Sequence, residues 1–384
     1  MLIAPKPAAH FDKGAIKQLP SIVRETGADA VMIVTDAALA RTPVIGTVTY
    51  ELAEAEIPVH VFTGVHPNPT TDDLAAGAAA LAEMGAAEAD GKRVALVAVG
   101  GGSPIDAAKG IALAAVNPQR GRELDYRNHF DVAALPIVAV PTTAGTGAET
   151  NAFGVVTDPE THRKFYVGHA TSMPAAAILD PELTVGLPPS VTAATGMDAL
   201  THALESYLSV NHNSWSDGIA LQVITMVSAN LPRAVEDGKD LDARSQLLLA
   251  AHMAGVAMAN TGLGVCHAIG HSLGGRWNIA HGVTLTMVLP GVLRFNLPVR
   301  TERTADIAFA LGVGDTHADA DRNAAAAIDA VAELRERVGL TKRLADFGIT
   351  SADYAQIAAD ALDDEVLANT PRQPTTADIA AILG

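Results

Sequence analysis

The chain has 384 residues, which at about 150 residues per domain predicts two domains, or at most three. It carries 43 Asp and Glu against 26 Lys and Arg, and its net charge of −17 makes nucleic acids and anionic membrane surfaces poor partners. Hydrophobic residues make up 49% of the chain and charged residues 18%, which excludes a disordered protein and is typical of a globular one.

Nothing in the sequence indicates export or membrane insertion. The N-terminal stretch MLIAPKPAAHFDKGAI lacks the apolar core and the small-residue cleavage site of a signal peptide. No apolar run approaches the roughly 20 residues that a membrane helix needs. The single cysteine excludes an internal disulfide and is typical of a reducing compartment. We therefore expect a cytoplasmic protein.

The first half alternates short apolar strands with Ala-rich helical stretches. The predicted strands are Ala30–Thr35, Val59–Phe62, Val94–Val99 and Pro136–Val140, and Thr71–Met84 is a predicted helix. Apolar strands separated by helices indicate parallel βαβ units. We predict an α/β domain with a parallel sheet over residues 1–187.

The pattern changes at Leu187-Pro188-Pro189, after which helical periodicity dominates. One late stripe, formed by Ile328, Val331, Leu334 and Val338, has the spacing of three and four that an amphipathic helix requires. We predict an all-helical domain over residues 188–384.

The sharpest feature of the first domain is a glycine loop between a strand and a helix, Val99 to Asp106 (VGGGSPID). Its glycines allow the backbone to approach a ligand closely. Ser103 is a predicted N-cap, Pro104 suits the first helical position, and Asp106 has capping-box spacing. The helix start would offer free N–H groups to a phosphate, although a ligand-free turn is the alternative. Neither G-x-G-x-x-G nor a P-loop motif is present here.

Two further features suit a nucleotide. The loop Pro141–Glu149 (PTTAGTGAE) follows a predicted strand, where loops of an open α/β sheet line the ligand crevice. Taken alone, an ordinary turn rich in Thr and Gly explains this loop about as well. Asp36 ends the first of the predicted strands. Its carboxylate would bind a ribose and repel a 2′-phosphate, which favours NAD over NADP, but for Asp36 taken alone a helix-capping role is the preferred interpretation.

The second domain concentrates side chains that bind metals. Asp198 and His202 are four residues apart on a predicted helix, and so are His267 and His271, so each pair shares a helix face. His281 follows beyond a Gly-Gly break. One carboxylate and several imidazoles suit Fe, Zn, Mn, Ni or Co better than Mg or Ca.

Two neighbours of these residues are interpreted as structural. Glu205 is expected to lie one position off the face shared by Asp198 and His202. Cys266 is expected to be a buried small hydrophobe.

With these motifs assembled, the chain resembles the iron-containing (group III) alcohol dehydrogenases. GGGSPIDAAK, PTTAGTGAE, ATGMDALTHALESY and HAIGHSLGG…HG occur in the family's order and spacing. The resemblance extends from the Asp36 strand to Asn369-Thr370-Pro371-Arg372. It implies the dehydroquinate synthase-like fold, with a dinucleotide-binding α/β domain and a helical catalytic domain.

The resemblance assigns roles residue by residue. It implies that the metal ligands are Asp198, His202, His267 and His281, and that His271 is an active-site residue and not a ligand. It implies that the cofactor is bound by Asp36, Asn68, Gly101, Gly102, Ser103, Asp106, Thr142, Thr143, Thr146, Lys164 and Leu183. The segment Leu367 to Arg372 departs from the family's usual residues, and so does Met258. The identity of the substrate is therefore the property that the resemblance implies least well.

The implied activity is NAD(P)-linked, metal-dependent interconversion of a small primary alcohol and its aldehyde. NAD is the expected cofactor with NADP as the alternative, and Fe(II) the expected metal with Zn(II) or Mn(II) as alternatives. A homodimer or larger homo-oligomer is expected by analogy. The rivals are a glycerol-dehydrogenase-like or maleylacetate-reductase-like oxidoreductase, a dehydroquinate-synthase-like lyase, and a non-enzymatic metal-storage protein.

Overall fold

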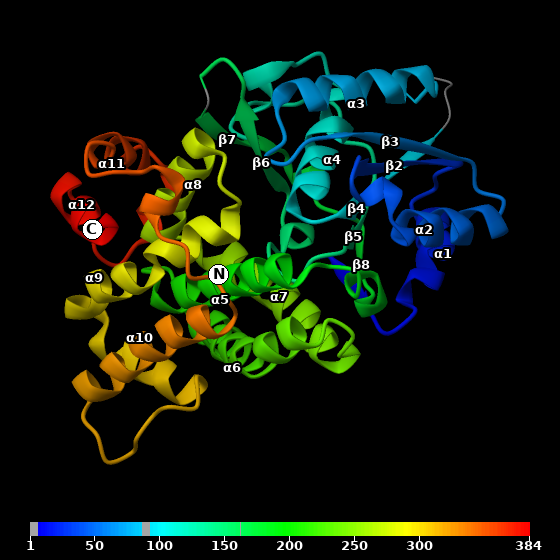
Figure 1. The fold of residues 1–384 in the computed structure, drawn as a ribbon. Helices are drawn as coiled ribbons and strands as arrows, with labels where there is room; N and C mark the ends of the chain where they lie inside the picture. Colours follow the sequence, from blue (N-terminus) through cyan, green and yellow to red (C-terminus); the bar gives the residue numbers. More distant parts are fainter. Residues whose placement is uncertain (1–6, 87–92, 162) are drawn as a thin grey trace. The chain divides into compact units, whose positions relative to one another are not determined.

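The computed structural model describes residues 7–86, 93–161 and 163–384. It divides the chain into two compact units (Figure 1). The α/β unit contains the chain up to Thr143 and again from Gly147 to Thr184. The helical unit contains Ala144–Thr146 and Val185–Gly384. The boundary predicted between residues 187 and 188 lies three residues beyond this junction. Residues 1–6, part of the stretch examined for a signal peptide, lie outside the described residues.

The α/β unit is built on a six-stranded parallel sheet with the order β1-β8-β5-β4-β2-β3. The strands are β1 (Ala8–Phe11), β2 (Ala30–Asp36), β3 (Val59–Val65), β4 (Val94–Gly100), β5 (Ile137–Pro141) and β8 (Ala176–Leu179). The four predicted strands are confirmed as β2 to β5. The structure adds β1, β8 and an antiparallel hairpin of β6 (Phe153–Asp158) and β7 (Arg163–Gly168).

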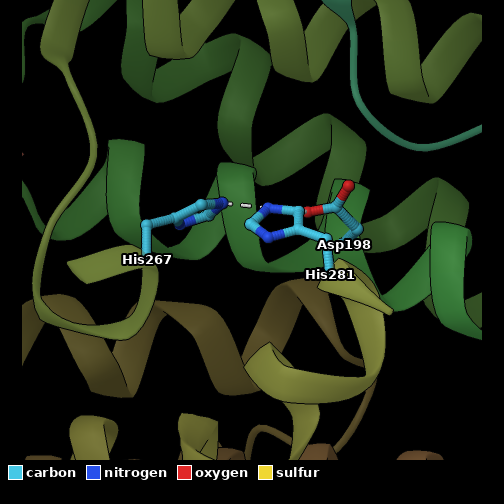
Figure 2. Close-up of side chains that lie close together, drawn as sticks. All are labelled: Asp198, His267 and His281. Atoms are coloured by element: carbon cyan, nitrogen blue, oxygen red, sulfur yellow. Dashed lines mark ion pairs between the residues drawn. The ribbon is translucent and has the colours of Figure 1, made fainter. Parts of the chain in front are cut away.

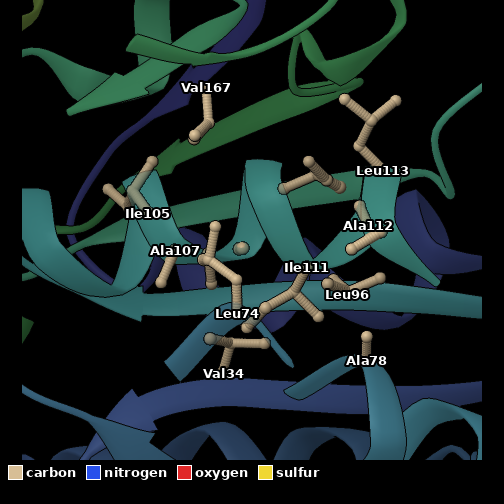
Figure 3. Close-up of a cluster of buried hydrophobic side chains, with 14 of the residues drawn as sticks. Val34, Leu74, Ala78, Leu96, Ile105, Ala107, Ile111, Ala112, Leu113 and Val167 are labelled. Atoms are coloured by element: carbon tan, nitrogen blue, oxygen red, sulfur yellow. The ribbon is translucent and has the colours of Figure 1, made fainter. Parts of the chain in front are cut away.

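Alternate residues of the central strands enter two separate apolar cores. Met32 and Val34 of β2 pack in one core, and Val31 and Ile33 in the other. The first core contains α3 (Thr71–Glu83) and α4 (Gly102–Ala114), whereas the second contains α1 (Leu19–Glu25) and α2 (Pro43–Glu54). Figure 3 shows the first core, where Leu74, Ile105 and Ile111 pack over the strands. Burial on both faces explains why β2 is apolar at every position from Ala30 to Val34 and β4 along its whole length.

The sheet order reverses between β2 and β4. From β2 the chain adds β3 on one side, and it then returns to place β4 and β5 on the other. In an open α/β sheet, ligands bind at the carboxyl ends of the strands where this reversal occurs. Asp36 ends β2 and Gly100 ends β4, so the two nucleotide motifs lie at adjacent strand ends.

The helical unit consists of α5 (Pro189–Leu208), α6 (Ser214–Glu236), α7 (Leu241–Thr261), α8 (Val265–Trp277), α9 (His281–Ala310), α10 (Ala320–Arg337), α11 (Tyr354–Leu362) and α12 (Thr376–Leu383). Helix α5 is its centre, since every residue from 196 to 208 is buried. The predicted stripe of Ile328, Val331 and Leu334 is buried along α10, and Val338 is buried at its C-cap.

Helix α9 meets the length and composition of a membrane span, although the sequence shows no uninterrupted apolar run of that length. Its most apolar window is 56% buried within the structure, and buried core helices of globular proteins satisfy the same criteria. Arg300, two residues after Pro298, has a non-helical backbone (φ −139°, ψ 24°) that interrupts the helix.

Candidate metal centre and nucleotide loops

Three helices of the helical unit gather the predicted ligands around one oxygen of Asp198. Asp198 Oδ1 lies 3.4 Å from His202 Nε2 and 3.7 Å from both His267 Nε2 and His281 Nε2. Asp198 and His202 come from α5, His267 from α8, and His281 is the first residue of α9. Figure 2 shows Asp198 and the imidazoles of His267 and His281 close together, with dashed lines for their ion pairs.

These separations fit a first-row transition metal. With metal–ligand bonds of about 2.0–2.2 Å, the ligand atoms of a tetrahedral site lie roughly 3.3–3.6 Å apart, so the distance of 3.4 Å falls in this range and those of 3.7 Å lie just above it. Asp198 Oδ1 and His267 Nε2 are buried without a hydrogen-bond partner among the described residues, which is rare for buried polar atoms unless an ion or water serves them. One atom each from Asp198, His267 and His281 lies within 4.8 Å of the others. His202 is outside this tightest set despite its contact with Asp198.

The side chains of this site have strongly perturbed pKa values. Burial opposes ionisation of Asp198, but His202 and His281 outweigh it and hold the pKa of Asp198 well below its usual range. Burial lowers the pKa of His202 to about 4, against the attraction of Asp198. Burial also acts on His267, but Glu205 and Asp198 overcome it and raise its pKa to about 9. At neutral pH a metal must therefore displace a proton from His267.

Glu205 is part of this site, and the prediction that it lies off the ligand face was wrong. Its Oε2 accepts a hydrogen bond of 2.6 Å from His267 Nδ1, which leaves Nε2 of that ring for a metal. The carboxylate also accepts the backbone N–H groups of Gly264 (3.0 Å) and Cys266 (2.7 Å). The available signal was its spacing of seven residues from Asp198, because seven residues return to the same helix face after two turns.

His281 is positioned by close packing of the first turn of α9 against the backbone of α5. Helix α8 continues through Gly274 and Gly275, and the predicted Gly-Gly break is wrong: the chain turns instead at Asn278, which has a φ of 51°. A Cβ atom on Gly282 would lie 2.2 Å from the carbonyl oxygen of Ala194 in α5. Only glycine therefore lets α9 approach α5 closely enough to bring His281 to Asp198.

His271 lies beside the ligands but is held by a different residue. Its ring stacks on His281 at 5.5 Å between centroids and lies 6.0 Å from His267. Its Nδ1 is 2.7 Å from Asp364 Oδ2, a contact that the sequence does not reveal because 93 residues separate the two. Cys266 is fully buried, as predicted, and its Sγ lies 3.6 Å from the carbonyl oxygen of Leu285.

In the α/β unit, the glycine loop begins α4 without a side-chain cap. The N-cap is Gly101 and Gly102 is the first helical residue, so the prediction that Ser103 is the N-cap is wrong. Gly100 has a φ of 152°, and a Cβ atom there would lie 2.5 Å from Pro104. The first N–H groups of α4 have no side-chain acceptor from the cap, as an anion-binding helix start requires.

Asp106 connects α4 to β6 and makes no capping hydrogen bond at the start of α4. Its Oδ2 accepts the N–H of Val155, and Oδ1 lies 3.6 Å from Lys109 Nζ. Lys109 is fully buried and donates to the carbonyls of Ala148 and Phe153 and to Asn151 Oδ1. The structure thus gives Asp106 a role in holding the loop region together, instead of the predicted capping box.

The threonine loop divides between the two units. Thr142 is buried, and its N–H donates to the carbonyl of Gly100. The side chain of Thr143 packs against Gly101, close to the position that a Cβ atom there would take. Both belong to the α/β unit. Thr146 belongs to the helical unit, in a segment whose Gly145 packs against Thr195 of α5.

Two other predicted cofactor residues lie at the carboxyl ends of neighbouring strands: Asp36 ends β2, and Asn68 follows β3. Asn68, with a φ of 55°, accepts a hydrogen bond of 3.0 Å from Lys164 Nζ, so the structure joins these two predicted residues. Asp36 Oδ1 accepts the N–H groups of Ala38 and Leu39, so it forms a turn before η2 (Leu39–Arg41), whose N-cap is Ala38 and not Asp36 as the capping alternative expected. Leu183 is buried in the second core of the α/β unit.

A parallel sheet with an uncapped glycine loop at its reversal point, and a separate His/Asp metal group, define a class of nucleotide-linked metalloenzymes. Family comparison agrees. The iron-containing alcohol dehydrogenase family matches residues 6–181, and the C-terminal part of the Fe-containing alcohol dehydrogenase family matches residues 192–384. The chain belongs to the iron-containing alcohol dehydrogenase family.

Individual relatives match along nearly the whole chain. The NAD-dependent methanol dehydrogenase of Bacillus methanolicus is 36% identical over 98% of this chain and 97% of its own length. Lactaldehyde reductase of Escherichia coli (strain K12) is 34% identical over 97% of this chain and 96% of its own. A solved 1,3-propanediol oxidoreductase aligns with a TM-score of 0.95 at 35% identity, covering 100% of this chain and 99% of the other. The predicted family and fold class are confirmed, and the protein is an oxidoreductase of the alcohol dehydrogenase class.

Proposed function

We propose that this enzyme interconverts a small primary alcohol and its aldehyde, with NAD as the hydride carrier and a divalent metal, Fe(II) first, in the helical unit. The observation that carries the proposal is the convergence of three imidazole Nε2 atoms on Asp198 Oδ1. Two of these ligand atoms, Asp198 Oδ1 and His267 Nε2, are buried without a hydrogen-bond partner among the described residues. The relatives named for methanol, lactaldehyde and 1,3-propanediol support a small substrate.

The residues that would hold the metal are Asp198, His202, His267 and His281. When bound, the metal would supply a Lewis acid that lowers the pKa of the substrate hydroxyl. Glu205 keeps the Nδ1 proton of His267 engaged and so keeps Nε2 directed at Asp198. His271, outside the ligand set, takes the hydroxyl proton during alcohol oxidation. When bound, NAD would supply the hydride acceptor for oxidation of the alcohol.

The nucleotide would bind at the reversal point of the sheet. Its diphosphate would meet the uncapped start of α4, and its ribose would meet the end of β2. Asp36 has one oxygen engaged in its turn, and its negative charge disfavours a 2′-phosphate. Asp36→Ser should retain the turn and raise the NADP/NAD ratio of kcat/KM about tenfold or more, since like charges in contact cost several kcal/mol. An unchanged ratio would contradict this role of Asp36.

The central test is NADH oxidation with short aldehydes, and with the ketone of glycerol for the polyol alternative. Metal-stripped protein is compared with protein reloaded with Fe(II), Zn(II) or Mn(II). We expect turnover only after reloading. His267→Ala should lose both metal and turnover, whereas His271→Ala should keep the metal and turn over slowly. NADH binding without turnover under any metal would move the assignment to a lyase-like reaction. A homo-oligomer in the cytoplasm remains our expectation, and size-exclusion chromatography with light scattering tests the oligomer.

A further inference from the structure

A polar seam joins α8 to the C-terminal segment that contains α11 and η8 (Glu365–Asn369). His271 Nδ1 contacts Asp364 Oδ2 at 2.7 Å, and Ser272 Oγ donates to Asp360 Oδ2 at 3.3 Å. Arg276, one turn further along α8, forms an ion pair with the same Asp360 carboxylate. Two aspartates four residues apart therefore hold the same helix face, but only Asp364 contacts a residue beside the metal group.

The two oxygens of Asp364 have separate tasks. Oδ1 accepts the N–H of Val366 at 3.1 Å and begins η8, while Oδ2 faces the imidazole of His271. Burial opposes ionisation of this carboxyl, but His271 and the N–H of Val366 hold the pKa of Asp364 below its usual value. A carboxylate can only accept hydrogen bonds, so Nδ1 of His271 carries a proton and donates it.

The consequence concerns the other nitrogen of the ring. In a neutral imidazole with Nδ1 protonated, Nε2 holds a lone pair and can accept a proton. Only about a tenth of the His271 side chain is exposed, and its ring lies nearly parallel to that of His281, so it has little freedom to turn over. The carboxylate and the stacking together select one orientation and one tautomer.

We propose that Asp364 is the positioning residue of His271, holding its ring in the Nδ1–H tautomer so that Nε2 can accept the hydroxyl proton of the alcohol. This inference rests on the proposed oxidoreductase function. In oxidation the O–H bond breaks and its proton moves to His271 Nε2. The C–H bond breaks and its electron pair leaves as hydride to NAD, and the C=O bond forms. In reduction of the aldehyde each transfer reverses.

The substitution Asp364→Asn distinguishes this role from a purely structural one, in which Asp364 only holds α8 to the C-terminal segment. If the asparagine keeps its oxygen on the N–H of Val366, its amide faces His271 and donates to Nδ1. The contact and the start of η8 survive, but the tautomer inverts and Nε2 becomes a donor. We expect kcat to fall about 10- to 100-fold, as for other orienting partners, with KM nearly unchanged. In the His271→Ala background the same substitution should add no further loss.

Asp360→Asn is the matched control, since it changes the neighbouring carboxylate of the seam without touching a ring. It should lower the melting temperature and leave kcat within about twofold, the range of ordinary substitutions away from the reacting groups. The direct readout is the tautomer itself, from long-range ¹H–¹⁵N spectra of ¹⁵N-histidine-labelled, zinc-loaded protein. The His271 signals are identified by their loss in His271→Ala.

Two results would overturn the inference. One is a wild-type spectrum with His271 in the Nε2–H tautomer. The other is an inverted tautomer in Asp364→Asn with kcat unchanged, which would make Asp364 a structural fastening only. If wild-type protein turns over no alcohol or aldehyde, the proposed function fails, and the spectrum still decides whether Asp364 sets the tautomer of His271.

Discussion

Glu205→Gln tests whether the carboxylate behind His267 sets the affinity for metal. Glu205 is buried and accepts three N–H donors at 2.6–3.0 Å. A glutamine that keeps its oxygen on Gly264 and His267 turns its amide toward the N–H of Cys266. The donor left unpaired there costs about 1–3 kcal/mol of stability. The lost orienting charge should weaken metal binding roughly 10- to 100-fold.

The assay is competition for Zn(II) between the protein and a chromophoric chelator, together with urea unfolding of the metal-free protein. Ser206→Ala is the matched control, because it is the next residue of α5, is fully buried, and accepts a hydrogen bond from Thr261 Oγ1. It should lose about 0.5–1.5 kcal/mol of stability and keep its zinc affinity. If Glu205→Gln bound zinc as tightly as wild type, the hydrogen bond to His267 would have no role in ligation.

Three further outcomes follow from named contacts. Because the pKa of His267 is about 9 without metal, apparent zinc affinity should rise about tenfold per pH unit below pH 9 and level off above it; a flat profile from pH 6 to 8 would contradict this. Gly282→Ala should cost about 1–3 kcal/mol and weaken zinc binding, since its Cβ atom meets the carbonyl of Ala194, whereas Gly218→Ala, in open space on α6, should do neither. Lys109→Met should lower the unfolding free energy by about 3–5 kcal/mol and leave zinc affinity unchanged, because two buried acceptors and the partly buried carbonyl of Phe153 lose their donor. Urea unfolding and chelator competition measure both, and a normal stability would refute the structural role of the lysine.

The sequence predicts those parts of the fold in which apolar residues follow one another without interruption. Strands β2, β4 and β5 are buried on both faces, so their apolar runs stand out between turns. Strand β1 is four residues long and mostly exposed, and β8 is four residues long, too short for periodicity to reveal either. The turn at Asn278 was not predicted for another reason. Glycines near a helix end suggest that the helix breaks there, but Gly274 is buried inside α8.

For the site, sequence spacing predicts contacts within a helix but not between helices. The four-residue interval between Asp198 and His202 is sufficient to place both on one face of α5. The contact between His271 and Asp364 depends on how α8 packs against a segment 93 residues away, and no local pattern encodes that. Glu205 lies between these cases. The sequence shows its interval of seven residues from Asp198, but it does not show that its hydrogen-bond partner is His267.

The buried helix α5 has a consequence for how the protein persists in a cell. An ion held by Asp198, His267 and His281 would cross-link α5, α8 and α9, which the single cysteine cannot do covalently. Occupancy at a hundred times the dissociation constant would add about 2.7 kcal/mol to the stability of the folded form. Metal supply would then set not only how fast the enzyme works but also how long each copy survives proteolysis.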